Sequence, residues 1–262
     1  MSERNRRSWD WQAERYQATH LQSRTTVYYW SEAYPNEDDL HLLGDVRGLR
    51  VLDLGSGAGQ SGIALAKRGA EVTCYDISKK QLEIGQRFAT EDGVAIQFIQ
   101  GNMEDLGVLP RHHFDLVISC AAISYVEDAA KVFQEVAKVL KLGGQFVLSC
   151  EHAIWMALGA KYLWPQAHED PSYFYRGPIC FRWKESDPRE FEILCFRRPM
   201  QDYFNALVRA GFIIERMEEL PLIKERLAND SFFSEILQTR PQEVEFAQLY
   251  PQAVVFSTRL HK

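Results

Sequence analysis

Three glycines and one acid are the residues whose types and spacing best fit chemistry. Gly55, Gly57 and Gly59 follow the apolar run 51–54 and precede a helical pattern. A turn of this kind lets a ligand approach the backbone, and the free N–H groups of the helix favour a negative group. Asp76 comes about twenty residues later, where an acid can accept hydrogen bonds from both hydroxyls of a ribose. Glycines alone would equally fit a tight strand-to-helix turn, but with Asp76 they predict a site for a nucleoside cofactor.

The spacing of the glycines separates two classes of cofactor. Nicotinamide dinucleotides are bound by the pattern G-x-G-x-x-G. Here the third glycine is Gly59, and Gln60 stands where the pattern requires its last glycine. This spacing disfavours a dinucleotide-dependent oxidoreductase, which stays an unlikely alternative.

Residues 49–151 contain the elements that must position this loop. Short β-branched runs alternate there with helical patterns, which is typical of a parallel sheet covered on both faces. Ser78 followed by Gln81 predicts a capping box at the start of a helix that runs to about residue 91. Another helical stripe begins at Ala129 and is stopped by Gly143-Gly144. The predicted strands are 50–54, 71–75, 95–99, 114–119 and 145–150.

The two flanks of this core have different patterns. The first fifty residues show helix-like spacing, with Trp9, Ala13, Tyr16 and His20 on one face, and we expect a lid or brace. Residues 151–199 are irregular and rich in aromatic side chains, which indicates an inserted cap. Helix and strand patterns resume at 202–214 and at 253–258. The expected division is a lid at 1–48, a cofactor-binding core at 49–152, a cap at 153–199 and a completion of the core sheet at 200–262.

Five motifs together resemble the class I S-adenosylmethionine-dependent methyltransferases, and specifically the small-molecule members of the methyltransferase type 11 kind. The resemblance covers roughly residues 40–152. It implies a Rossmann-like α/β fold with a seven-stranded sheet whose last strand is antiparallel, S-adenosyl-L-methionine as cofactor, and methyl transfer to an N, O or C atom of a small molecule. The motifs are the loop 51–60, the acidic strand end 76–78, the turn 101–103, the strand start 114–117 and the turn 140–144.

The resemblance also implies which residues bind the cofactor. Asn102 replaces a frequent Asp in the adenine turn, but its amide oxygen can still accept a hydrogen bond. Cys120 and Ala121 follow the fourth strand at the carboxyl edge, where open α/β sheets bind ligands. The predicted cofactor-binding residues are Gly55, Ser56, Gly57, Gly59, Asp76, Ile77, Asn102, Met103, Cys120 and Ala121.

Two further residues are candidates for a role at the reacting centre. Tyr16 lies in a segment similar to the lid helix of small-molecule members, whose Tyr reaches the methionine end of the cofactor; its alternative role is helix packing. His152 follows the fifth predicted strand, and an imidazole with a pKa near its ordinary value of about 6.5 can take a proton at neutral pH. Alternatively, His152 only hydrogen-bonds the start of the cap.

The net charge and the length of the apolar runs limit which partners the protein can bind. The net charge of -6 gives no general attraction for a phosphate backbone, and no apolar run reaches the length of a membrane helix. Members that act on DNA or on protein glutamine have an Asn/Asp-Pro-Pro-aromatic turn where this chain has Ser119-Cys120-Ala121-Ala122. We therefore expect a cytoplasmic protein with a small-molecule acceptor and no nucleic-acid or membrane partner.

The remaining questions concern metal, catalysis and assembly. The adjacent His112 and His113 lack a nearby set of acidic ligands, so no metal site is predicted. A non-catalytic S-adenosylmethionine-binding protein on the same scaffold stays an alternative, because cofactor motifs do not prove turnover. The sequence predicts no oligomeric state.

Overall fold

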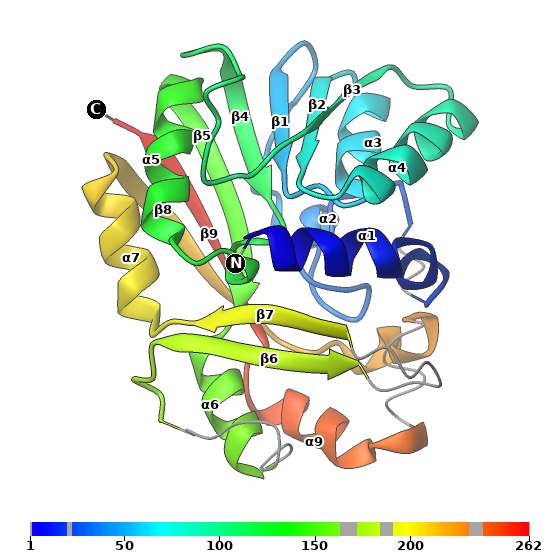
Figure 1. The fold of residues 1–262 in the computed structure, drawn as a ribbon, viewed down its shortest axis with the longest axis vertical. Helices are drawn as coiled ribbons and strands as arrows, with labels where there is room; N and C mark the ends of the chain where they lie inside the picture. Colours follow the sequence, from blue (N-terminus) through cyan, green and yellow to red (C-terminus); the bar gives the residue numbers. More distant parts are fainter. Residues whose placement is uncertain (1, 20–22, 163–171, 184–190, 231–237, 262) are drawn as a thin grey trace.

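A seven-stranded sheet forms the centre of the computed structural model, which describes residues 2–19, 23–162, 172–183, 191–230 and 238–261 (Figure 1). The strand order is β3-β2-β1-β4-β5-β9-β8. Pairing is parallel from β3 to β5, whereas β9 is antiparallel to both of its neighbours. The expected sheet with an antiparallel last strand is therefore confirmed. The strands are β1 (Arg50–Leu54), β2 (Glu71–Asp76), β3 (Ile96–Gln100), β4 (Phe114–Ser119), β5 (Leu140–Glu151), β8 (Phe212–Leu220) and β9 (Ala253–Leu260).

Helices cover both faces of this sheet, because its central strands have apolar side chains on both sides. Leu52 and Leu54 of β1 pack in one cluster with α5 (Ala129–Val139) and α7 (Met200–Arg209). Val51 packs in the other cluster with α3 (Gln60–Lys67), the segment 27–46 and α9 (Pro241–Leu249). Next to α3 lies α4 (Lys79–Glu91), which contacts β2 and β3. Short helical turns are α2 (Glu37–Leu40), η1 (Ile123–Tyr125) and η2 (Lys224–Asn229).

Two local predictions need correction. The fifth strand begins at Leu140 rather than 145, because Leu140 pairs with Phe114 before a register shift that brings Gln145 opposite Leu116. The helix before it therefore ends at Val139, not at the glycines. The capping box at Ser78 is only half formed: its side chain accepts from the Gln81 N–H, but the Gln81 amide oxygen accepts from Gln17 instead.

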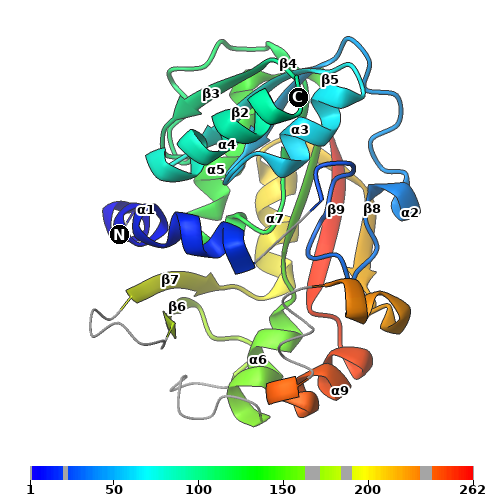
Figure 2. The same ribbon diagram turned by 90° about the vertical axis from the view of Figure 1, so that its right-hand side faces the viewer.

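The helix α1 (Ser2–Thr19) lies across the carboxyl ends of the parallel strands, between the sheet and a separate hairpin (Figures 1 and 2). Hydrogen bonds of Asn5 and Gln17 hold α1 in this position. The Asn5 amide donates to the carbonyls of Tyr125 and Leu194 and accepts from the Leu194 N–H, each at 2.9 Å. Farther along, Gln17 bonds Gln60 and Gln81 at the starts of α3 and α4. α1 thus lies where the sequence predicts a lid.

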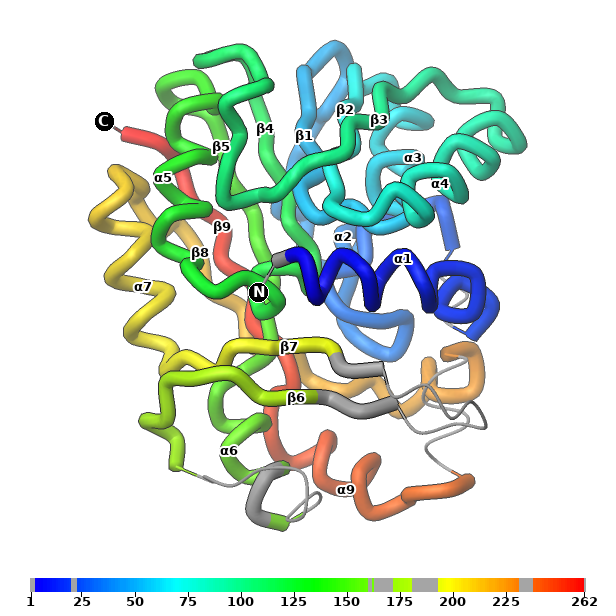
Figure 3. Tube along the Cα trace, in the orientation of Figure 1, coloured from blue at the N-terminus to red at the C-terminus, as the bar shows by residue number. Residues whose placement is uncertain are grey.

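The segment predicted as a cap is more regular than its composition indicated. It contains α6 (Ala153–Tyr162) and a two-stranded antiparallel sheet, β6 (Gly177–Trp183) with β7 (Phe191–Arg197). β7 runs beside α1 although the two are far apart in the chain (Figure 3). Among the aromatic residues of 151–199, Trp164 lies outside the described residues, and so do the side chains of Phe181, Trp183 and Phe191. Among the described residues, no helix combines the length and the apolar character needed to cross a bilayer.

The bonds of Asn5 should be what keeps α1 on the hairpin. In Asn5→Ala, the buried N–H and C=O of Leu194 lose their partner, and a buried polar group left unpaired costs about 1–3 kcal/mol. We expect a lower Tm and faster amide hydrogen exchange along α1 and β7. Arg7→Ala, which changes an exposed side chain of the same helix, is the control. Unchanged exchange of α1 in Asn5→Ala would show that other contacts hold the helix.

Candidate active site

The glycine loop joins β1 to α3 and is held against the end of β2. The N–H groups of Gly55 and Ser56 donate to the Tyr75 carbonyl at 2.8 and 3.2 Å. Gly55, Gly57 and Gly59 have φ of +72°, +55° and +72°, a region that residues with a Cβ rarely adopt. A Cβ on Gly55 would come within 2.5 Å of the Ala122 Cβ and 2.7 Å of the Met103 Cε. The loop therefore needs glycine at Gly55 for packing as well as for conformation.

Gly57 faces open space beside Asp76. A Cβ placed on Gly57 would meet no atom within 4 Å, and its N–H donates to Asp76 Oδ2 at 2.8 Å. Asp76 Oδ1 accepts from the Ser78 N–H at 2.8 Å. Each carboxylate oxygen has a further lone pair, so Asp76 can still accept from ribose hydroxyls. The loop 55–59 thus forms an open cradle beside Asp76, whose carboxylate can accept further hydrogen bonds. This arrangement fits a nucleoside cofactor.

Burial raises the pKa values of two acids around the loop 55–59. Burial raises the pKa of Asp76 above its usual value, while the N–H groups of Ser78 and Gly57 act in the opposite direction. Burial also raises the pKa of Asp53 to about 7, against a 3.0 Å bond from the Gly62 N–H. Asp10 of α1 accepts from the Ser78 hydroxyl and from the Lys80 N–H, at 2.8 and 3.1 Å. The lid helix thus adds a negative group next to Asp76.

The other predicted cofactor residues lie on turns at the same edge. Asn102 Oδ1 accepts from the Glu104 N–H at 3.0 Å, and the Met103 methyl lies against Gly55. Ala121 has a φ of +53°, and its N–H donates to Ser149 Oγ at 3.0 Å. This strained turn follows β4 directly. Burial raises the pKa of the Cys120 thiol well above its ordinary value, so Cys120 keeps its proton at neutral pH. The Ile77 carbonyl accepts from the Gln100 side chain.

His152 faces away from these turns. Its Nε2 lies 2.9 Å from Glu219 on β8, and its Nδ1 accepts from the Ile154 N–H at 3.1 Å. Burial lowers the pKa of the imidazole, partly offset by Glu219. Both ring nitrogens are thus engaged, and one of them bonds the start of α6. This geometry favours the alternative in which His152 supports the cap, and its role as a base stays a prediction without geometric support.

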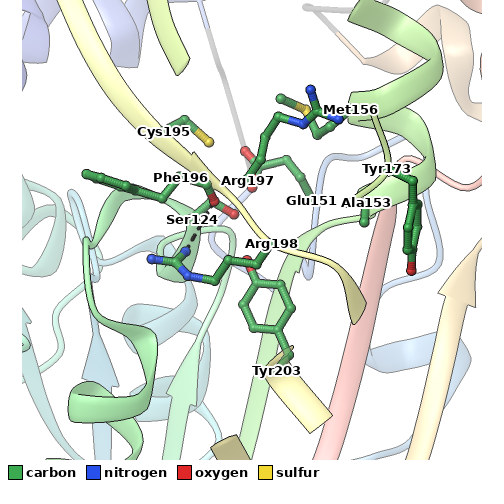
Figure 4. Close-up of a pocket in the computed structure, with 10 residues that line it drawn as sticks. All are labelled: Ser124, Glu151, Ala153, Met156, Tyr173, Cys195, Phe196, Arg197, Arg198 and Tyr203. Carbon is green, nitrogen blue, oxygen red and sulfur yellow. Dashed lines mark hydrogen bonds between the residues drawn. The ribbon is translucent and has the colours of Figure 1, made fainter. Parts of the chain in front are cut away.

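The neighbouring Glu151 instead lines a pocket beyond the end of β5 (Figure 4). Consecutive side chains of an extended strand point to opposite sides, which separates Glu151 from His152. Glu151 Oε2 is buried without a hydrogen-bond partner among the described residues, and burial raises the pKa of this carboxyl to about 7. Sequence reasoning missed Glu151. The pocket is lined by Ser124, Glu151, Ala153, Met156, Tyr173, Cys195, Phe196, Arg197, Arg198 and Tyr203.

Tyr16 connects the lid helix to this pocket. Its ring meets Trp9 edge-on at 5.4 Å, and Trp9 meets Tyr125 of η1 in the same way at 5.3 Å. Burial raises the pKa of Tyr16 to about 12, and the charge of Glu151 adds to this shift. Tyr16 therefore keeps its proton at neutral pH and lies within electrostatic reach of Glu151.

The family of the chain follows from comparison with known proteins. The model of the family described as "Methyltransferase domain" matches residues 52–148. A ubiquinone biosynthesis O-methyltransferase of Pectobacterium carotovorum is 30% identical over 60% of this chain and 70% of its own length. A crystal structure of an S-adenosylmethionine-dependent methyltransferase from Mesorhizobium loti has a TM-score of 0.60 at 27% identity, covering 84% of this chain and 94% of that one.

The chain belongs to the class I S-adenosylmethionine-dependent methyltransferases. S-adenosylmethionine is the cofactor of this family, as the loop and Asp76 predict. An uncharacterized methyltransferase of Bacillus subtilis, YbaJ, is 41% identical over 38% of this chain and 39% of its own length. The chain thus spans well under two thirds of this relative's length.

Gly55 and Gly57 should respond differently to the same substitution. Alanine at either position has an unfavourable positive φ, but only Gly55→Ala also creates contacts of 2.5 and 2.7 Å. We expect Gly55→Ala to lower Tm strongly. Gly57→Ala should leave the fold intact and lower the affinity for S-adenosylhomocysteine. Thermal unfolding and calorimetry measure the two effects. Equal loss of Tm in both variants would contradict the open cradle at Gly57.

Asp76→Ala should lower the affinity for S-adenosylhomocysteine by at least about tenfold. The variant removes a charged acceptor for two hydroxyls, and each such bond contributes roughly 1.5–3 kcal/mol. Asp45→Ala is the control, because Asp45 is an exposed acid paired only with Arg47 among the bonds described. Calorimetry decides: an unchanged dissociation constant in folded Asp76→Ala would remove Asp76 from the site.

Proposed function

We propose that the chain transfers the methyl group of S-adenosylmethionine to a small-molecule acceptor bound in the Glu151 pocket. The observation that supports this most is the position of the pocket. It opens where β5 ends, at the same sheet edge as the glycine loop and Asp76, and it contains a buried carboxyl oxygen without a partner. A cofactor cradle and a separate cavity at one edge are what a two-substrate transfer requires.

The residues at this edge of the sheet would have different roles. The loop 55–59 and Asp76 would hold the nucleoside, with Asn102 and Met103 beside the adenine. The cofactor, when bound, supplies a methyl group already activated by its sulfonium sulfur. The chain then needs to align the acceptor with that methyl group and to exclude water, for which α1 lies across the edge and the hairpin packs beyond α1 (Figure 2).

Two observations support a small acceptor methylated on oxygen. The similar proteins include ubiquinone biosynthesis O-methyltransferases, whose name specifies an oxygen. The turn after β4 reads Ser119-Cys120-Ala121-Ala122, unlike the Asn/Asp-Pro-Pro-aromatic turn of members that methylate amide or amino nitrogen on macromolecules. We therefore place oxygen before nitrogen or carbon as the methylated atom.

The test uses methyl-labelled S-adenosylmethionine and metabolite fractions, with mass spectrometry of the product. Label that moves to a small organic molecule supports the proposal. Tight binding of S-adenosylhomocysteine with no transfer to any fraction would instead indicate a non-catalytic binding protein. Thermal stabilisation by NAD but not by S-adenosylhomocysteine would favour an oxidoreductase.

Tyr173 and Phe174 offer a matched pair for the acceptor pocket. Tyr173 lines the pocket, whereas the neighbouring Phe174 is 65% exposed and does not. We expect Tyr173→Ala to raise KM for the acceptor severalfold while the affinity for S-adenosylhomocysteine stays nearly unchanged. Phe174→Ala should change neither. Equal loss of acceptor and cofactor affinity in Tyr173→Ala would refute a separate acceptor pocket.

A further inference from the structure

We propose that Glu151 takes the proton from a hydroxyl acceptor as its oxygen is methylated. The inference rests on the proposed function and specifies it: the acceptor is a neutral alcohol or phenol, and the base is Glu151 rather than the neighbouring His152. Glu151 is the last residue of β5, two residues before α6, at the edge of the sheet that also bears the glycine loop.

Two unpartnered oxygens in the pocket fit the two hydrogen-bonding functions of a hydroxyl group. Glu151 Oε2 and Ser124 Oγ both line the pocket, and both are buried without a partner in the part of the chain that the structure describes. A carboxylate can only accept, whereas a serine hydroxyl can donate. A bound hydroxyl can therefore donate its proton to Glu151 while its oxygen accepts from Ser124. Buried polar atoms without partners are rare, so this pair is where a hydroxyl group in the pocket would gain two hydrogen bonds.

The groups that face Glu151 leave it able to act as a base. Arg198 is the charge that most lowers its pKa, but the Arg198 guanidinium is tied to the carbonyls of Val126, Glu127 and Phe196. Burial outweighs this charge, and the resulting pKa of about 7 leaves a large carboxylate fraction at neutral pH. Among the residues that the structure describes, the other titratable groups around it include Tyr16 of α1, Tyr125 of η1, Cys150 of β5, Tyr173, Cys195 and Arg197 of β7, and Tyr203 of α7.

Neighbouring candidates are less suited to this step. The pKa values of Tyr125, Tyr203 and Cys195 are all raised well above their ordinary values, mainly by burial, so these groups keep their own protons. Tyr16 keeps its proton for the same reason. His152 uses both ring nitrogens away from the pocket. Glu151 is the group whose protonation state changes in the neutral range and whose oxygen is unoccupied.

The step balances without an added reactant. The acceptor oxygen forms a bond to the methyl carbon, the carbon–sulfur bond breaks with its electron pair on sulfur, and the hydroxyl O–H bond breaks. The proton passes to Glu151 Oε2, which releases it to solvent after the products leave. Proton removal by a positioned carboxylate contributes typically about 10²–10⁴-fold in rate.

The experiment compares Glu151→Gln with Glu219→Gln on a panel of substituted phenols and matched anilines, with labelled S-adenosylmethionine. Glu219 is an acid on β8 that pairs with His152 outside the pocket. We expect transfer to phenols in the native chain and in Glu219→Gln, and a loss of about 10²–10⁴-fold in Glu151→Gln. The loss should shrink on nitrophenols that are already ionised at the assay pH, because they need no base.

Two further readouts separate a base from a merely structural carboxyl. Native turnover should rise as pH increases through about 7, since only the ionised carboxylate accepts a proton. In Glu151→Gln this rise of turnover with pH should be absent. Carboxyl NMR with label on glutamate alone should show one group titrating near 7 that disappears in Glu151→Gln. Calorimetry should give the same S-adenosylhomocysteine affinity in both variants.

Three results would overturn the inference. One is a Glu151→Gln variant that keeps most of its rate on un-ionised phenols. A second is an equal loss on ionised and un-ionised phenols, which would make Glu151 a structural group. The third is transfer to anilines alone, or to metabolite fractions without any phenol or alcohol product; this leaves methyl transfer standing while refuting a hydroxyl acceptor. Absence of transfer in every assay would refute the proposed function itself.

Discussion

The parallel pairing of β1, β2, β4 and β5 is the constraint on which the rest of the structure depends. It brings the ends of these four strands to one edge of the sheet, and every loop that leaves this edge contributes to the site. The Gly57 N–H bonds Asp76 across two of these ends, and the Ala121 N–H bonds Ser149 across two others. The side chains of Asp76 and Ser149 thus tie neighbouring turns of this edge to one another.

The same edge gathers buried acids, and this has an energetic consequence. Burial raises the pKa values of Asp53, Asp76 and Glu151, which means that their ionised forms are disfavoured in the folded chain. An acid whose folded pKa lies above its unfolded value destabilises the fold as pH rises from the unfolded value through the folded one. For Asp53 and Glu151 this window extends from about 4 to about 7. A bound group with positive charge would offset part of this cost, which suits a sulfonium cofactor.

The core of the fold could be predicted from the sequence because its signals are local. The loop at Gly55–Gly59 and the acid at Asp76 are separated by a fixed strand–helix–strand unit, so their spacing predicts their meeting. The bonds that hold α1 could not be predicted in this way. Asn5 joins residues more than a hundred positions away, and neither its type nor its neighbours in the chain indicate such partners.

The assignment of His152 shows a different limit. Sequence patterns place the end of a strand only to within a residue or two, and a shift of one residue exchanges the side of the sheet on which a side chain lies. An imidazole at the end of β5 was the more familiar base, but the carboxyl before it points into the pocket. Residue type alone thus points to His152, whereas the geometry favours Glu151 as the candidate base.

The central claim is that one sheet edge holds the cofactor and the acceptor in adjacent parts, with Glu151 between the sulfur and the cap. A crystal structure with S-adenosylhomocysteine tests it most directly. The account predicts the ribose on Asp76, the adenine beside Asn102 and Met103, and the sulfur open toward the pocket of Glu151 and Ser124. A sulfur that points away from this pocket, or one separated from it by ordered side chains, would contradict the account.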